Sequence, residues 1–276
     1  MKTVLVTGGA SGMGKAVCKT LAENGYFVYS LDINKSDDEI ANVKQLIVDV
    51  TNISSIKQAY DIISKETKTL DAIINFAGII MMNSLIEISE EEFVKIFNIN
   101  LFGVYRINKI FLPMISENKG KIIITTSELA PNKILPFNSI YSISKKALDA
   151  YAEGLRMELG LLGIDVITLR PGAVQTNLIN SSSSALDKLV ANTVMYKGYT
   201  NNFKKIVDSQ QGGAIPAEKI GKLVLKILNK KKPKFVYTKN ASIKLKLLNL
   251  VPARMQLGIF RVLLIRSLQE LHRPSS

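Results

Sequence analysis

The chain has 276 residues, of which 47% are hydrophobic and 21% charged, a balance typical of a globular protein. Its single cysteine, Cys18, excludes an intrachain disulfide or thiolate metal cluster, and its single histidine, His272 near the C-terminus, argues against an imidazole-based triad or zinc site. The net charge of +13 is uneven: residues 1–218 hold 22 basic and 22 acidic residues, whereas residues 219–276 hold 14 basic residues and one acid, Glu270. Chemistry must therefore use hydroxyls, carboxylates, amines or a cofactor, and we expect no metal site.

The N-terminus, MKTVLVTGG, leads directly into a strand-like run and a glycine turn. It has neither the apolar segment nor the small-residue cleavage site of a signal peptide. No uncharged apolar stretch approaches the roughly 18 residues that span a bilayer. We therefore expect a cytoplasmic protein.

Short β-branched runs alternate with stretches of helical spacing through the first 170 residues. The runs are TVLVT, FVYSLD, QLIVDV, AIINFAG, KIIITTS and DVITLRPG. Each is almost continuously apolar, as strands buried on both faces of a parallel sheet are. The pattern predicts an α/β fold with a doubly wound parallel sheet. Ligands of such sheets bind beyond the carboxyl ends of the strands, so functional residues are expected directly after each run.

The first run is followed by TGGASGMG, where Gly8, Gly12 and Gly14 allow a tight turn at a helix N-terminus. Free N–H groups and the helix dipole favour an anion there, such as the diphosphate of a dinucleotide. The spacing differs from the commoner G-x-G-x-x-G, and a plain structural turn is the alternative. The helical run KAVCKTLAENG that follows favours the dinucleotide, and Cys18 falls in the apolar pattern of that helix.

Asp32 ends the second run, where a carboxylate accepts hydrogen bonds from the adenosine ribose and repels a 2′-phosphate. Ser11 also offers no positive charge to a phosphate. Both residues favour NAD over NADP, and Lys35 is close enough to soften the preference. A solvated aspartate that caps the next turn is the alternative.

Two tyrosine–lysine pairs have the spacing that places both side chains on one face of a helix: Tyr141 and Lys145 in YSISK, and Tyr105 and Lys109 in YRINK. A neighbouring lysine can lower the pKa of a phenol, ordinarily about 10, and turn it into a proton donor and acceptor. The pattern alone does not decide between the pairs.

Taken in order from residue 3 to about residue 176, the motifs resemble the short-chain dehydrogenase/reductase family in its compact single-domain form. TGGASGMG resembles the family's cofactor motif, and NFAG resembles its N-N-A-G with Phe76 in place of the second asparagine. Ser127 lies where the family has its catalytic serine, and Tyr141 follows it by fourteen residues, an ordinary family spacing. PGAVQT resembles the segment that holds the nicotinamide carboxamide.

The resemblance implies a Rossmann-type fold with a defined site. The expected catalytic residues are Asn100, Ser127, Tyr141 and Lys145. The expected contacts of NAD, with NADP as the alternative, are Gly8, Ser11, Gly12, Met13, Gly14, Asp32, Asp49, Val50, Asn75, Ala77, Gly78, Tyr141, Lys145, Pro171, Val174 and Thr176. The pair Tyr105 and Lys109 has no preceding strand-end serine within reach, so we interpret it as ordinary helix surface.

In such a site Tyr141 would protonate a carbonyl oxygen, or take a proton from an alcohol, while hydride moves to or from the nicotinamide. Lys145 and the oxidised ring would lower the pKa of the phenol, and Lys145 would hold the nicotinamide ribose. Ser127 would stabilise charge on the substrate oxygen. The resemblance implies that Asn100 fixes a water linking Lys145 to solvent.

The substrate site is expected to be built largely from residues 177–215, where the resemblance ends. NLINSSSSALDKL predicts a mobile loop running into a helix. Apolar residues that face either substrate or core are Met81, Met82, Leu129, Leu135, Phe137, Leu178, Met195 and Tyr196. Glu128 is a polar candidate, although we favour a solvated loop position for it over a substrate contact. No arginine is placed to clamp a carboxylate, so we expect a lipophilic secondary alcohol or ketone.

Two other functions remain open: an NADPH-dependent carbonyl or 3-oxoacyl reductase of the same fold, and a non-catalytic dinucleotide-binding sensor. Retention of all four catalytic residues argues against the sensor.

A helix, a basic turn and a last strand are predicted in PAEKIGKLVLKILNKKKPKFVY, completing a domain over residues 1–240. Residues 241–276 form a basic, apolar extension, broken by Pro252 and with helical spacing over 255–271. It either packs over the active site or a subunit interface, or contacts anionic membrane. Nucleic acid is a weaker option, because the basic residues are interleaved with aliphatic ones. Relatives are often dimers or tetramers, so we expect a homo-oligomer.

Overall fold

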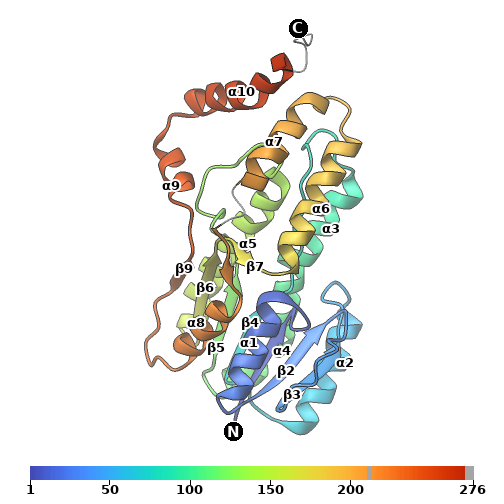
Figure 1. Ribbon diagram of the computed structural model, residues 1–276. Helices are drawn as coiled ribbons and strands as arrows, with labels where there is room; N and C mark the ends of the chain where they lie inside the picture. Colours follow the sequence, from blue (N-terminus) through green and yellow to red (C-terminus); the bar gives the residue numbers. More distant parts are fainter. Residues whose placement is uncertain (210–212, 271–276) are drawn as a thin grey trace.

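The computed structural model describes residues 1–209 and 213–270 and centres on a parallel sheet (Figure 1). The seven strands have the order β3-β2-β1-β4-β5-β6-β9. They are β1 (Lys2–Thr7), β2 (Tyr26–Asp32), β3 (Val43–Ile47), β4 (Ala72–Asn75), β5 (Lys121–Thr125), β6 (Asp165–Pro171) and β9 (Val236–Lys239). The doubly wound α/β sheet predicted from the apolar runs is confirmed. Its order reverses between β1 and β4, the place where such sheets bind ligands.

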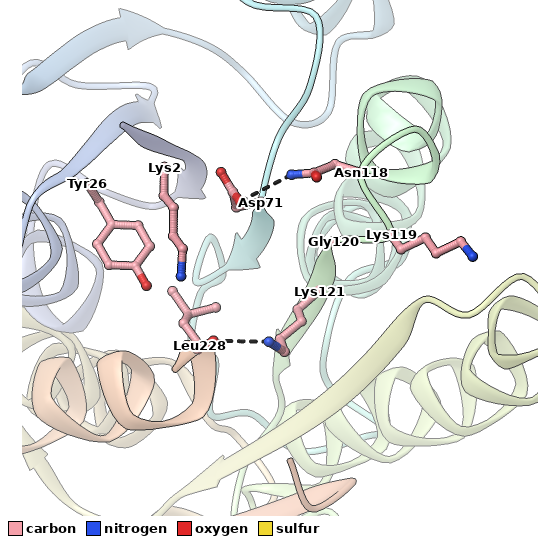
Figure 2. Close-up of a pocket in the computed structure, with 8 residues that line it drawn as sticks. All are labelled: Lys2, Tyr26, Asp71, Asn118, Lys119, Gly120, Lys121 and Leu228. Carbon is pink, nitrogen blue, oxygen red and sulfur yellow. Dashed lines mark hydrogen bonds between the residues drawn. The ribbon is translucent and has the colours of Figure 1, made fainter. Parts of the chain in front are cut away.

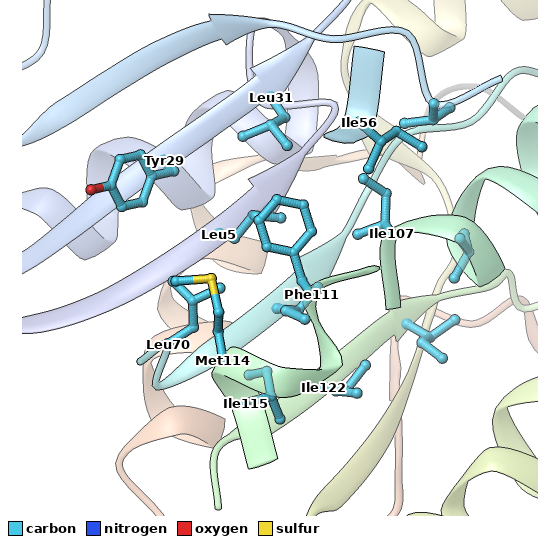
Figure 3. Close-up of a cluster of buried hydrophobic side chains, with 14 of the residues drawn as sticks. Leu5, Tyr29, Leu31, Ile56, Leu70, Ile107, Phe111, Met114, Ile115 and Ile122 are labelled. Atoms are coloured by element: carbon cyan, nitrogen blue, oxygen red, sulfur yellow. The ribbon is translucent and has the colours of Figure 1, made fainter. Parts of the chain in front are cut away.

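Helices cover both faces of the sheet, because the central strands are apolar on both sides. On one face lie α2 (Ile53–Glu66), α4 (Val104–Ser116) and α5 (Ser139–Gly160); on the other lie α1 (Gly12–Glu23) and α8 (Glu218–Leu228). Neighbouring residues of β1 divide between the two layers: Leu5 packs with Phe111 of α4 (Figure 3), whereas Val4 and Val6 pack with α1 and α8. Cys18 is buried in the second layer, as predicted.

A π-helical turn, η1 (Asn98–Gly103), joins α3 (Glu90–Phe97) to α4 without a break in the helix. Such turns contain an extra residue per turn and occur frequently at functional sites. This one carries Asn100.

The segment after β6 is more regular than predicted. The short paired strands β7 (Val174–Gln175) and β8 (Ile215–Pro216) flank α6 (Asn177–Asn192) and α7 (Lys197–Ser209) in the chain. The helices α9 (Ile243–Leu250) and α10 (Ala253–Glu270) end the described part of the chain. The expected loop before the helix is wrong, because α6 begins at Asn177. Leu186 and Leu189 pack with Phe137 and Phe203, and this burial offsets the weak helix propensity of the serines.

The C-terminal extension forms two helices separated by Pro252, as the break in the pattern predicted. Figure 1 shows α6, α7 and α10 at the end of the molecule opposite the N-terminus. None of the helices in the described part of the chain combines the length and the hydropathy needed to cross a bilayer.

A polar hollow lies at the amino ends of the strands, between Lys2 of β1, Asp71 before β4 and Lys121 of β5 (Figure 2). Lys121 Nζ donates to the Leu228 carbonyl at 3.0 Å, and Asn118 donates to Asp71 at 3.1 Å. The hollow is therefore on the edge of the sheet opposite the predicted site.

Candidate active site

The glycine turn brings the N-terminus of α1 against the end of β1. Gly8 and Gly12 have φ values of 69° and 52°, the left-handed region that favours glycine. A Cβ on Gly14 would lie 2.0 Å from the Gly8 carbonyl oxygen, so the two backbone segments touch. Ser11 is the N-cap, yet its side chain makes no capping hydrogen bond. The Ser11 side chain thus leaves the first N–H groups of α1 uncapped, and such groups favour an anion.

Two further predicted contacts lie beside this turn. The Asp32 carboxylate at the end of β2 accepts a hydrogen bond from the Ala10 N–H at 3.1 Å. A Cβ on Gly12 would lie 3.1 Å from Thr176 Cβ, so the residue after β7 packs on the turn. Thr176 Oγ1 donates to the Val174 carbonyl at 3.4 Å, which holds this segment together. Residues more than a hundred positions apart in the sequence therefore meet at one turn.

The end of β4 connects the glycine turn to the predicted catalytic residues. The Ala77 N–H donates to Thr7 Oγ1 of β1 at 3.2 Å. A Cβ on Gly78 would lie 3.1 Å from Asn100 Oδ1 and 3.5 Å from Lys145 Nζ. Gly78 thus lies within reach of both polar side chains.

Other predicted cofactor residues lie at the same edge, with side chains engaged in the protein. Asn75 is buried, and its Nδ2 donates to Asn108 Oδ1 of α4 at 2.9 Å. Asp49 Oδ1 accepts from the N–H and hydroxyl of Thr51 at 2.8 and 2.7 Å. Val50 is buried against η1, where a Cβ on Gly103 would lie 2.8 Å from it. Pro171 ends β6, and its carbonyl accepts from the N–H of residue 128 at 2.9 Å.

Asn100 joins the π-helical turn to two other elements. Its Oδ1 accepts from the Ile79 N–H at 2.8 Å, and its Nδ2 donates to the Ile79 carbonyl at 3.0 Å and to Ser144 Oγ at 3.1 Å. Ser144 Oγ donates in turn to the Tyr141 carbonyl at 2.8 Å. Ser144 was not predicted, although its position three residues after Tyr141 places it on nearly the same helix face.

Ser127, Tyr141 and Lys145 converge in a buried site, with 7%, 7% and 6% of their surfaces exposed. Ser127 lies two residues past the end of β5, and its Oγ accepts from the Leu129 N–H at 3.1 Å. Tyr141 and Lys145 belong to the first turns of α5, with Nζ 5.9 Å from the centroid of the phenol ring. Lys145 Nζ donates to the Thr125 carbonyl at 3.1 Å.

The rival pair has the closer contact but the wrong surroundings. Lys109 Nζ donates to the Tyr105 hydroxyl at 2.9 Å, and both residues are exposed on α4. The interpretation of this pair as helix surface is confirmed. Burial beside a serine, rather than the distance between phenol and ammonium, distinguishes the two pairs.

Comparison with known proteins decides the family. The profile of the short chain dehydrogenase family matches residues 2–187. The chain is 31% identical over 232 residues to a 3-ketodihydrosphingosine reductase of Bacteroides thetaiotaomicron, covering 84% of this chain and 85% of that one. The chain belongs to the short-chain dehydrogenase family. It is therefore an NAD(P)-dependent oxidoreductase, and the resemblance inferred from the motifs is confirmed.

A second curated relative and a solved structure are also similar to this short-chain dehydrogenase. It is 29% identical over 226 residues to an estradiol 17-beta-dehydrogenase 2 of Rattus norvegicus, covering 76% of this chain and 56% of that one. A solved short-chain dehydrogenase structure from Streptomyces avermitilis is 21% identical with a TM-score of 0.75, covering 99% of each chain. The structural likeness extends over the C-terminal extension as well as the sheet.

The turn of this short-chain dehydrogenase fits the diphosphate of a dinucleotide. The helix N-terminus is uncapped by side chains, and the glycines leave no Cβ between it and the edge of the sheet. Asp32 and Thr176 lie beside the turn, and Ala77 lies against Gly8.

Burial controls the titration of the two central groups. It raises the pKa of Tyr141 to about 12, and a hydrogen bond with Ser127 offsets only part of this effect. It lowers the pKa of Lys145 to about 8. The expectation that Lys145 and an oxidised nicotinamide lower the pKa of the phenol stays a prediction for the enzyme with cofactor bound. In the protein's own groups, desolvation penalises both charged forms. The phenol is therefore protonated at neutral pH and suited to donate a proton.

The surroundings of the phenol are apolar. Tyr141 packs in a cluster whose partly buried members include Met81, Leu129 and Ile79. Three of the other predicted apolar candidates, Met82, Phe137 and Tyr196, belong to the cluster under α6 and α7. Leu135 is half-buried and Met195 is exposed. The side chain of Leu178 lies outside those described.

Glu128, next to the serine, is not the solvated residue that sequence reasoning favoured. It is half-buried, and its Oε2 accepts from the Ser242 N–H at 2.6 Å, where the C-terminal extension begins. Burial raises the pKa of this carboxyl, and the Ser242 N–H and the charge of Lys246 oppose that effect. No local sequence signal indicates this contact, because its partners are 114 residues apart.

Proposed function

We propose that this short-chain dehydrogenase interconverts a lipophilic secondary alcohol and its ketone with NAD(H). The observation that carries the proposal is the buried group of Ser127, Tyr141 and Lys145 beside the apolar residues Met81 and Leu129. A bound nicotinamide would supply or accept the hydride.

The chain's own groups would move the proton and stabilise the charge. Tyr141 would donate its proton to the carbonyl oxygen in reduction and recover it in oxidation. Ser127 would hydrogen-bond that oxygen as negative charge develops on it. Lys145 would hold the nicotinamide ribose and stabilise the phenolate, and Asn100 would hold a water that connects Lys145 to solvent.

Residues around the glycine turn would hold the cofactor. We assign the diphosphate to Gly8, Ser11, Gly12, Met13 and Gly14; the adenosine to Asp32, Asp49 and Val50; and the nicotinamide side to Asn75, Ala77, Gly78, Pro171, Val174 and Thr176. The uncapped helix and the packing of Thr176 on Gly12 support this assignment.

The substrate class is supported by the names of two relatives, which refer to ketodihydrosphingosine and estradiol. Both are lipophilic, and both relatives are named for a ketone or alcohol reaction. An NADPH-dependent carbonyl or 3-oxoacyl reductase is the second candidate. A non-catalytic sensor is disfavoured, because it would have no use for a serine, a phenol and an ammonium gathered in one buried site.

A screen of secondary alcohols and ketones graded by chain length tests the proposal through the absorbance of NADH. Each buried methylene contributes about 0.8 kcal/mol, so we expect kcat/KM to rise roughly fourfold per added carbon until the site is filled. The matched controls are analogues of equal length that end in a carboxylate. A flat series, or a preference for the carboxylates, would contradict the lipophilic assignment.

Asp32 is expected to determine the choice between the two cofactors. Asp32→Ala should improve NADP relative to NAD by roughly tenfold or more in the ratio of dissociation constants, because the repulsion of a 2′-phosphate is removed. The nearby Lys15 forms an ion pair with Asp38 at 2.7 Å, which reduces its availability to that phosphate.

The matched control is Asp37→Ala, which removes an exposed carboxylate from the same connection. It should leave the ratio unchanged. Equal changes in the affinity for both cofactors in Asp32→Ala would contradict a selective role for this carboxylate.

We also infer a cytoplasmic homo-oligomer that contacts membrane peripherally. Exposed apolar side chains on the outer helices, such as Phe102 and Met157, are consistent with subunit contacts. Light scattering of the full chain measures the oligomeric state.

A further inference from the structure

α9 presents an apolar stripe to solvent. Ile243, Leu247 and Leu250 are spaced four and three residues apart, so they share one face, and they are 73%, 59% and 80% exposed. Lys244 and Lys246 are also exposed and fall on either side of this stripe. The helix therefore has its apolar residues outside and its cations beside them.

α10 is apolar on two faces. Its inner face is packed: Phe260 and Leu264 join the cluster under α7, and the Leu264 carbonyl accepts from Asn202 Nδ2 at 2.7 Å. Its outer face carries Met255, Ile259 and Val262, again spaced four and three residues apart and all exposed. No described side chain covers this second face.

The charge on these helices is predominantly positive. Residues 219–276 contain 14 basic residues and one acid. The exposed Arg254 and Arg261 add cations to α10. Among the described side chains, the salt bridges within 4.0 Å all lie in the body of the protein and none uses a cation of α9 or α10.

Hydrogen bonds hold the extension against the loop that follows Ser127. Besides the contact between Glu128 and Ser242, Asn249 Nδ2 donates to Asn132 Oδ1 at 2.6 Å. Asn249 Oδ1 accepts from the N–H of residue 133 at 2.9 Å. The apolar stripe of α9 is therefore attached to the segment that carries the catalytic serine.

Three occupants can be weighed by charge and polarity. A second copy docked by this same face would bring two strongly basic surfaces together, and the repulsion opposes such a contact. Nucleic acid would match the charge but leave the aliphatic stripes in water. An anionic bilayer satisfies both features, with cations at the headgroups and aliphatic side chains in the acyl boundary.

We propose that α9 and the outer face of α10 form a docking surface for an anionic lipid bilayer. The surface consists of Ile243, Leu247, Leu250, Met255, Ile259 and Val262 with the cations Lys244, Lys246, Arg254 and Arg261. It deepens the proposed function, since a lipophilic substrate would reach the loop after Ser127 from the membrane.

Flotation of the full-length protein with vesicles tests the proposal. The vesicles are phosphatidylcholine alone and phosphatidylcholine mixed with phosphatidylglycerol. We expect wild type to bind the anionic vesicles and to lose binding as salt is raised. The double variants Leu247→Glu/Leu250→Glu and Lys244→Gln/Lys246→Gln should each weaken binding at least about tenfold. The matched control is Leu161→Glu, an exposed leucine before β6 at the opposite edge of the sheet.

Vesicle binding is measured independently of catalysis, so each outcome tests the membrane proposal by itself. Circular dichroism and turnover of a short, water-soluble ketone should be the same in wild type and the α9 variants. A failure of the proposed reaction would appear as absent turnover in wild type, whatever the outcome of the vesicle assay. The proposal is overturned if wild type ignores anionic vesicles, binds neutral ones equally, or is matched by the α9 variants. A change of oligomeric state in Leu247→Glu/Leu250→Glu would show that the face binds a second copy of the chain. A gel shift of an oligonucleotide by the wild-type protein would show that it binds nucleic acid. Either result also overturns the membrane proposal.

Discussion

Tyr141→Phe should lower kcat about 10²- to 10⁴-fold on every substrate, the range expected when a general acid is removed. The phenol is buried beside Ser127, and burial raises its pKa and keeps it protonated as a proton donor. The ring remains, and with it the packing against Ile96 and Ile140. Cofactor affinity and the melting temperature should therefore change little. Stopped-flow and steady-state absorbance of NADH measure the loss.

Tyr105→Phe is the matched control, because it removes a hydroxyl from the same tyrosine–lysine spacing on an exposed helix surface. Its kcat should remain within about twofold of wild type. Turnover retained in Tyr141→Phe, with or without a change in Tyr105→Phe, would remove the phenol from the mechanism.

Gly14→Ala should reduce cofactor affinity roughly 10²-fold, the penalty for a shift of about 1 Å in a positioned site. The new Cβ would start 2.0 Å from the Gly8 carbonyl oxygen, and neither backbone segment can rotate away as a side chain can. The first turn of α1 must move off the strand, which also costs about 1–3 kcal/mol of stability. Titration calorimetry with NAD and thermal unfolding measure the two effects.

Gly154→Ala supplies the control for glycine replacement in a helix. Gly154 lies in α5 with nothing within 4 Å of the added Cβ, so the change should stabilise the helix by about 0.5–1 kcal/mol. NAD affinity should not change. Wild-type affinity in Gly14→Ala would show that the close approach of the turn is not what binds the diphosphate.

The sheet was predictable because each strand carries its own signal. Runs such as KIIITTS are apolar on both faces, and this property depends only on neighbouring residues. The ends of strands were less certain: β5 stops at Thr125, and Ser127 lies beyond it in the connection to α5. The order of the motifs nevertheless placed Ser127, Tyr141 and Lys145 in one site, and the structure brings these three together.

What could not be predicted depends on contacts across the fold. Asn100 on the π-helical turn is hydrogen-bonded to Ile79 and Ser144, and α6 packs through Leu186 and Leu189 against Phe137 and Phe203. These partners are distant in the sequence, so local propensity does not report them. The raised pKa of Tyr141 follows from burial, which a spacing of four residues does not report. Glu128 appeared solvated because its partner, Ser242, belongs to the far end of the chain.

Glu128 and Asn132 are hydrogen-bonded to the start and end of α9, so the predicted boundary near residue 240 does not separate two independent parts of the chain. Composition divides the chain there, but the half-buried Glu128 carboxylate, next to Ser127, receives its 2.6 Å hydrogen bond from the far side of that division. Cutting the chain at 240 would leave this acceptor without its donor, a loss that costs about 1–3 kcal/mol when it falls on a buried group. The loop after Ser127 thus keeps these hydrogen bonds only when the C-terminal helices have folded back onto the middle of the chain.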